Sequence, residues 1–236
     1  MPILGGVPGS RGARPRKEAR GTGLVSTFDR RKALWVAGAA VWITLVVIGV
    51  AALMRYSLNP GRQGNPPDVW PAASRLDRSP DRYTLVLAAH PRCPCTRATI
   101  AELAVIMKGC AGRVTAHVLF VQPPGVPERW AKTGLWRTVQ SIPGATASLD
   151  PNGTEAHRFD AFTSGQAVLY DPSGRRVFSG GITGARGEEG PNAGLRAVVA
   201  RLERNANLTS RTPVYGCPLH ALHRIDGKED HTCPQS

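Results

Sequence analysis

Two cysteines separated by a single residue, Cys93 and Cys95, follow an apolar run at residues 85–89. The thiolate is the form of cysteine that attacks disulfides and binds soft metals, so its fraction at neutral pH decides what such a pair does. His90 and Arg92 add positive charge beside the pair, and no acidic residue stands between the apolar run and the cysteines. This pattern indicates a reactive pair of thiols.

The elements around the pair support that interpretation. The run at 85–89 has no polar alternation, which is typical of a strand buried on both faces. Apolar residues after the pair recur at helical spacing, namely Ile100, Leu103, Ala104 and Met107. The cysteines are therefore expected at a helix start, where free backbone N–H groups and the helix dipole stabilise an anion. Pro94 suits that first turn because its missing N–H would have had no partner there.

The spacing of the pair also has a chemical consequence. A disulfide between residues i and i+2 closes only with strain, and strain makes the bond easier to reduce. Such a bond is expected to act as an oxidant or an isomerisation partner and not as a structural link. The alternative is an inert or permanently bridged pair.

Length and charge limit the other function classes. The chain has 236 residues, enough for one ordinary domain with appendages, and a formal net charge of +13. Residues 1–33 carry eight of the Lys and Arg residues against only Glu18 and Asp29. In the rest of the chain no basic run is interleaved with stacking aromatic residues. Nucleic acid is therefore not an expected partner.

Residues 34–54 form a stretch of 21 residues without a charged side chain. A helix of that length measures about 31 Å, which matches the hydrocarbon core of a bilayer. Basic residues are concentrated before the stretch, which by the positive-inside rule places the N-terminus in the cytoplasm and the rest outside. A buried core helix is the competing interpretation. The lipid bilayer is thus an expected partner of a single-pass protein.

The remaining segments follow from composition. Residues 1–33 are expected to form a disordered basic tail, and residues 55–80, rich in proline, an extended spacer. A globular domain is expected at 81–204, followed by a C-terminal extension at 205–236 that contains Cys and His.

Further elements are predicted within the domain. Strands are expected at 113–122, 145–149, 167–170 and 176–179, the last two as a hairpin, and helices at 128–140, 154–160 and 192–203. This order predicts an α/β fold with a mixed sheet and helices on both faces.

The order of elements, with a cysteine pair opening the first helix, resembles the thioredoxin-like superfamily over residues 81–204. More narrowly, the stretches HPRCPCTRATIAEL, FTSGQAVLYDPSGRRVFSGGITGARG and TPVYGCPL resemble bacterial membrane-anchored thioredoxin-like proteins of the RedB type, here with a Cys-Pro-Cys motif. The resemblance implies thiol–disulfide exchange. It also implies that Cys93 attacks and that Cys95 resolves the mixed disulfide.

Two features depart from that family. The usual pair has two residues between its cysteines, whereas only Pro94 intervenes here. The family also places a cis-proline, which presents backbone to the substrate and hinders metal binding, before the strand that follows the site. Here Thr163, Ser164 and Gly165 occupy that place. They are expected to support the site, and the missing proline favours a metal site more than the family pattern does.

The other cysteines leave alternatives open. Cys110 follows the first domain helix and is expected as a small buried apolar residue. A disulfide between Cys217 and Cys233 is expected to tie down the C-terminal extension outside the cytoplasm. Alternatively, Cys217 folds back on Cys93 and Cys95, with His90 nearby, to bind copper or another soft metal. Further candidate ligands in the extension are His220, His223 and His231.

The sequence therefore predicts a thiol–disulfide oxidoreductase without a cofactor, anchored in the bacterial inner membrane with its domain on the periplasmic side. Its expected partners are thiols and disulfides of envelope proteins. One alternative is a copper-binding module that delivers metal to an envelope metalloenzyme. A second alternative is a non-catalytic interaction domain that keeps only the thioredoxin-like fold.

Overall fold

The computed structural model describes residues 23–205 and 209–219. The chain divides into two compact units, residues 1–52 and residues 53–236, and each is described by itself.

The N-terminal helix α1 spans Gly23–Leu58. Its stretch Asp29–Leu58 is long and apolar enough to cross a membrane, a property that an anchor shares with a signal sequence. The large apolar side chains of residues 34–54 are exposed, as expected of a surface that lipid covers. The helix begins inside the segment predicted as a disordered tail. It ends two residues before Pro60, which cannot continue a helix.

A five-stranded sheet forms the second unit, with the strand order β3-β2-β1-β4-β5. The central strand, β1, pairs in parallel with β2 and antiparallel with β4, so the sheet is mixed. Its last six residues are buried, which explains the unbroken apolar run in the sequence. The bounds are β1 Tyr83–Ala89, β2 Val114–Gln122, β3 Ala145–Pro151, β4 Gln166–Tyr170 and β5 Arg176–Gly181.

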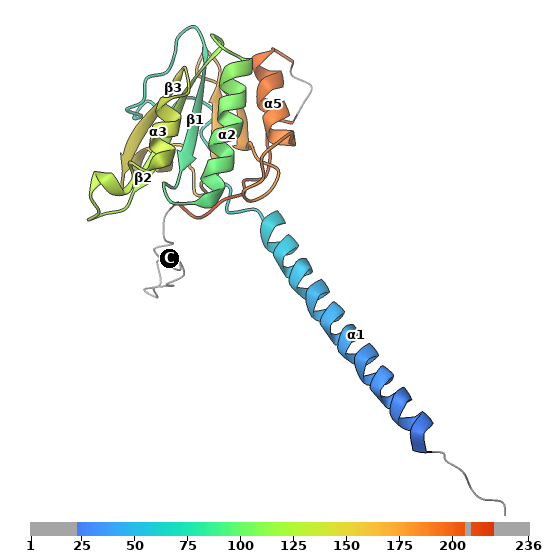
Figure 1. The fold of residues 1–236 in the computed structure, drawn as a ribbon. Coiled ribbons are helices and arrows are strands. Elements are labelled where there is room, and N and C mark those ends of the chain that lie inside the picture. The colour runs from blue at the N-terminus through green and yellow to red at the C-terminus, as the bar shows by residue number, and fades with distance from the viewer. Residues whose placement is uncertain (1–22, 206–208, 220–236) are drawn as a thin grey trace, which may run out of the picture. The chain divides into compact units, whose positions relative to one another are not determined.

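Helices cover both faces of this sheet. The main core packs α2 (Pro94–Gly109), α3 (Gly134–Gln140) and α5 (Ala193–Leu202) against one face, in front of the strands in Figure 1. On the other face α4 (Thr154–Arg158) packs Ala156 against residues of β1 and β2. The predicted α/β fold, a mixed sheet with helices on both faces, is confirmed.

One predicted helix is divided. Instead of a single helix over 128–140, a 3-10 turn at Glu128–Trp130 precedes α3, which begins at Gly134. Thr133 between them has extended backbone with ψ −171°. Residues 131–133 therefore form a connection, and only the last part of the predicted helix is α-helical.

The proline-rich segment at 55–80 does not stand apart as a spacer. The Trp70 ring packs against the rings of Phe159 and Tyr170 at centroid distances of 5.1 and 5.2 Å. The Trp70 N–H donates to the Gly174 carbonyl, and the Tyr170 hydroxyl donates to the Pro67 carbonyl. The prolines keep the backbone of this segment extended, but the Trp70 side chain packs the segment against the face of the sheet. The folded domain consequently begins before residue 81.

The described part of the C-terminal extension also belongs to the domain. The Ser179 N–H donates to the Ser210 carbonyl at 2.9 Å, and the Gly181 N–H to the Pro213 carbonyl at 3.1 Å. A Cβ atom at Gly181 would lie 2.5 Å from the Pro213 oxygen, so this close approach requires glycine. Residues 210–213 thereby cover the free edge of β5, which would otherwise expose unpaired backbone groups.

Candidate thiol site

The two closely spaced cysteines lie where β1 gives way to α2. Cys93 is the N-cap residue, with extended backbone at φ −83° and ψ 124°, and Pro94 is the first residue of the helix. Cys95 follows within the first turn. The structure therefore places the pair at the strand–helix junction that the sequence predicts.

A third thiol lies at the same place. The Sγ atom of Cys217, from the segment beside β5, is 2.9 Å from the Sγ atom of Cys93. Cys93 is 3% exposed, whereas Cys95 and Cys217 are half-buried. All three are free thiols in this structure. The contact with Cys217 accounts for part of the burial of Cys93.

The environment of Cys93 favours its thiolate. The thiols of Cys217 and Cys95 act as hydrogen-bond donors to the Cys93 sulfur, and the backbone N–H groups of the same two residues add to this effect. Together they hold the pKa of Cys93 far below its usual range, against the opposing effect of burial. The anion is thus stabilised by donors from both the helix start and the C-terminal segment.

The pKa values of the two donor thiols, Cys217 and Cys95, shift in the opposite direction to that of Cys93. The pKa of Cys217 is raised, chiefly because its proton is shared with the Cys93 thiolate, and then by Cys95 and by burial. The pKa of Cys95 is also raised, although its contact with Cys217 and the charge of Arg186 lower it. Contact with Cys93, burial and the Cys93 negative charge outweigh those two effects. These directions favour the thiolate at Cys93 and the protonated form at Cys95 and Cys217.

His90 and Arg92 border the pair. Burial lowers the pKa of His90 and the charge of Arg92 lowers it further, while the Cys93 anion raises it. His90 packs edge-on against the Trp130 ring, and the Arg92 guanidinium lies over the same ring at 5.1 Å. Sequence reasoning placed both as sources of positive charge, and the aromatic contact with Trp130 was not predicted.

Thr163, Ser164 and Gly165 lie beside the cysteines. Ser164 Oγ accepts a hydrogen bond from the His90 N–H at 2.9 Å and lies 2.8 Å from Thr96 Oγ1. Gly165 donates its N–H to the Ala88 carbonyl and has φ +92°. No cis peptide bond occurs in the described residues, these three included. The loop thus joins the end of β1 to the first turn of α2 through a serine hydroxyl.

The same loop holds the Cys217 segment. The Ser164 N–H donates to the Cys217 carbonyl at 2.8 Å, and the Leu219 N–H donates to the Phe162 carbonyl at 2.9 Å. Thr163 forms an antiparallel bridge with Pro218 between these two bonds. The cysteine-bearing segment is therefore paired with the loop in extended form.

Arg186 is a site residue that sequence reasoning missed. It comes from the glycine-rich loop after β5, donates to the Gly216 carbonyl, and lowers the pKa of Cys95 through its charge. Its guanidinium also donates to the Asn59 carbonyl at 3.2 Å. The available signal was an arginine in a loop that follows the last strand, which by itself does not reveal the contact.

Of the remaining predicted ligands and cysteines, the structure describes Cys110, which lies apart from this cluster. Cys110 is 2% exposed and packs in the main core. Cys233, His220, His223 and His231 lie outside the described residues, so the disulfide between Cys217 and Cys233 stays a prediction. Within the described residues, no three His, Cys, Asp or Glu side chains are arranged as a metal site.

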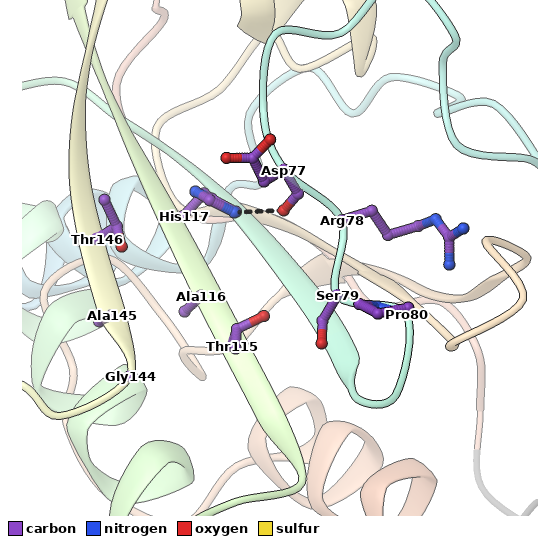
Figure 2. A pocket seen from close by; sticks show the side chains of 10 residues that line it. All are labelled: Asp77, Arg78, Ser79, Pro80, Thr115, Ala116, His117, Gly144, Ala145 and Thr146. Carbon is purple, nitrogen blue, oxygen red and sulfur yellow. Dashed lines mark hydrogen bonds between the residues drawn. The ribbon is translucent and has the colours of Figure 1, made fainter.

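An open hollow elsewhere on the domain carries no comparable chemistry. It is lined by residues 77–80 and by the beginnings of β2 and β3 (Figure 2). His117 Nε2 lies 2.9 Å from the Asp77 carbonyl there. The cysteines follow the opposite, carboxyl-terminal end of the parallel strand β1 and do not line this hollow.

No family model and no curated protein matches the sequence. A hypothetical protein from Sinorhizobium meliloti is similar in structure, at 23% identity over 69% of this chain and 94% of its own, with a TM-score of 0.49. An uncharacterised conserved protein from Geobacillus kaustophilus has 18% identity over 69% and 92%, with a TM-score of 0.48. A secreted Mycobacterium tuberculosis disulfide oxidoreductase homologous to E. coli DsbE has 12% identity over 54% and 84%, with a TM-score of 0.39.

Proposed function

We propose that this protein carries out thiol–disulfide exchange outside the cytoplasm while anchored to a membrane by α1. The observation that carries the proposal is the Cys93 sulfur at the start of α2, in contact with a second thiol and with backbone N–H donors. A stabilised thiolate is the species that attacks a disulfide. The proposed clients are thiols and disulfides of envelope proteins.

The chemistry runs in two exchange steps. The Cys93 thiolate attacks one sulfur of a client disulfide, forms a mixed disulfide and releases the other client sulfur as a thiolate. A second thiol of the cluster then attacks Cys93, forms an intramolecular disulfide and releases the client as a dithiol. In reverse, the intramolecular disulfide oxidises a client dithiol. Cys95, two residues from Cys93, is the second thiol that the sequence suggests.

Location follows from α1 and the charges around it. The apolar residues 34–54 supply the length for a span, and basic residues precede it. We therefore place the thiol domain on the periplasmic side of a bacterial inner membrane, as the likeness to RedB-type proteins suggests. A C-terminal fusion to alkaline phosphatase tests this, since the phosphatase becomes active only outside the cytoplasm. A fusion that is made in full but stays inactive contradicts the placement.

The activity is tested on the full-length protein in detergent. Wild-type protein should catalyse the reduction of insulin disulfides by dithiothreitol, and Cys93→Ser should abolish it. Cys110→Ala removes a thiol outside the cluster and serves as the control that retains activity. A protein that purifies with about one equivalent of copper and shows no exchange would instead be the metal-delivery module. Inactivity without bound metal would leave the interaction domain.

A further inference from the structure

Buried residues on both sides of Cys217 fix the C-terminal segment with the Cys217 sulfur against that of Cys93. Val214 is fully buried and its carbonyl accepts from the Gly61 N–H at 2.8 Å. Leu219, 4% exposed, packs on the far side of the sheet with Ala88 and Val121. Cys217 lies between these two anchors. Its place against Cys93 is therefore set by buried contacts on both sides.

The position of Cys217 also depends on a close approach between the backbone at Gly216 and the backbone at Ser164. A Cβ atom at Gly216 would lie 1.9 Å from the Ser164 carbonyl oxygen, so only glycine lets the segment lie against the loop. Arg186 holds the Gly216 carbonyl, and the Ser164 N–H holds that of Cys217. Consecutive carbonyl groups are thus bound from two different elements. A solvated tail would have no need of such contacts.

The two thiols near Cys93 differ in how freely they reach it. Cys95 stands two residues away at the start of the same helix, and a bond across that spacing distorts the geometry that disulfides prefer. Cys217 comes from a separate segment, 124 residues along the chain, with its sulfur already 2.9 Å from that of Cys93. A thiol held in contact gains from proximity without deforming the helix start.

From these contacts we propose that Cys217 is the resolving cysteine of the exchange reaction, forming the intramolecular disulfide with Cys93. This inference rests on the proposed function and names a residue of the same site. Cys93 first forms a mixed disulfide with one client sulfur, and the other client sulfur leaves as a thiolate. The Cys217 sulfur then attacks Cys93 and loses its proton, and the departing client sulfur takes up a proton. The client disulfide gains two electrons, and the two cysteines lose two.

The segment around Cys217 covers Cys93 and so controls the access of a client to it. With 3% of Cys93 exposed, a client reaches it only when the segment around Cys217 gives way. The bonds that must open include those from Ser164 to Cys217 and from Leu219 to Phe162. After the first client sulfur has left as a thiolate, the segment returns and brings the Cys217 thiol to the Cys93 sulfur, which still carries the second client sulfur, and its attack then displaces that sulfur. Closure and resolution are then one movement.

Disulfide mapping tests the pairing directly. Full-length protein in detergent is oxidised with oxidised dithiothreitol, alkylated and digested with trypsin without reduction. Cleavage after Arg92, Arg97, Arg211 and Arg224 yields CPCTR and TPVYGCPLHALHR, and the inference requires these two peptides to be linked. The Cys95→Ser variant should give the same link. A link from TPVYGCPLHALHR to the C-terminal peptide that contains Cys233, or a bond within CPCTR alone, overturns the inference.

Turnover separates this inference from the proposed function. Cys217→Ser should slow insulin reduction by about tenfold and accumulate a mixed disulfide between Cys93 and insulin. Cys95→Ser loses one donor to Cys93, so it should slow the reaction less than Cys217→Ser does and should not accumulate the mixed disulfide. Cys110→Ala, outside the cluster, is the control that keeps activity, and circular dichroism confirms that each variant is folded. If Cys95→Ser accumulates the mixed disulfide and Cys217→Ser does not, the resolving role passes to Cys95 while the proposed function stands. If wild-type protein is inactive, the proposed function itself fails.

Discussion

The sulfur of Cys93 accepts from donors that belong to two parts of the chain. Cys95 offers a thiol and an N–H from the helix start, and Cys217 offers the same two groups from the C-terminal segment. A helix start by itself supplies only the first set, and Pro94 removes one further N–H from it. The charge state of the site therefore depends on a residue that lies far away in the sequence.

Titration of the reduced full-length protein examines that dependence. The pKa of Cys93 is lowered, so its thiolate should persist as pH falls through about 8.5, where an ordinary thiol is protonated. Thiolate absorbance near 240 nm should accordingly remain at about pH 5. Cys217→Ala removes the largest lowering contribution, so the midpoint should rise toward the ordinary range. Cys110→Ala should leave the curve unchanged, and a wild-type curve that loses all thiolate near pH 8 contradicts the expectation.

Among the elements, the C-terminal segment differs most from its expected role. It pairs with β5 and then with the loop at 162–165, and so completes the sheet edge and the site together. Its fit depends on Gly216, whose hydrogen leaves room for the Ser164 carbonyl. The segment therefore acts as a cover that a single methyl group is expected to displace.

The variant Gly216→Ala tests the cover. The added Cβ would meet the Ser164 oxygen at 1.9 Å, so the segment must shift away from the loop. Alkylation of Cys93 by a bulky maleimide should become several-fold faster, at a stability cost of about 1–3 kcal/mol. Gly109→Ala is the matched control, because no atom lies within 4 Å of its added Cβ. Equal labelling rates in all three proteins would show that the segment does not restrict access to Cys93.

The proline-rich segment at 55–80, before β1, is expected to contribute to stability as the helices and strands do. Trp70→Ala removes a ring that packs against Phe159 and Tyr170, and should destabilise the domain by about 2–4 kcal/mol. Val69→Ala, at a neighbouring side chain that is 62% exposed, should change stability by less than about 0.5 kcal/mol. Urea denaturation of the full-length protein, followed by circular dichroism, measures both. Equal midpoints for the two variants would mean that this segment is a spacer after all.

The elements that the sequence predicted correctly are those with local signals. The buried run of β1, the helical spacing in α2 and the turn that joins β4 to β5 each lie within a few consecutive residues. Contacts between distant residues left a weaker signal, since the sequence offered the return of Cys217 to Cys93 and Cys95 only as an alternative, based on the residue types. The meeting of Cys217 with Cys93 requires Gly181 and Gly216 to admit neighbouring backbone, and a glycine in a loop does not reveal which partner approaches it.

At the scale of the whole molecule, the folded unit that contains the thiols begins within the last residues of α1. The Arg186 N–H donates to the Ser57 carbonyl at 3.1 Å, and its guanidinium donates to the Gly216 carbonyl. One arginine thus joins the chain that leaves the expected span to the residue before Cys217. Met54 ends that span three residues before Ser57, a length of chain that reaches at most about 10 Å. With the proposed anchoring, so short a connection is expected to favour exchange with disulfides held at the lipid surface.

A longer connection between the expected span and the domain should slow exchange with lipid-bound disulfides but not with soluble ones. Full-length protein in phosphatidylcholine vesicles is offered a lipid with a pyridyl-disulfide headgroup, and release of pyridine thione reports exchange. A Gly-Ser linker of about ten residues, inserted between Arg55 and Tyr56, lowers the effective concentration of the thiols at the surface. The rate with the lipid disulfide should fall several-fold, while the rate with soluble dipyridyl disulfide stays unchanged. The same linker added after Ser236 is the control and should alter neither rate. A fall in both rates, or in neither, would mean that the short tether does not direct the thiols to the membrane surface.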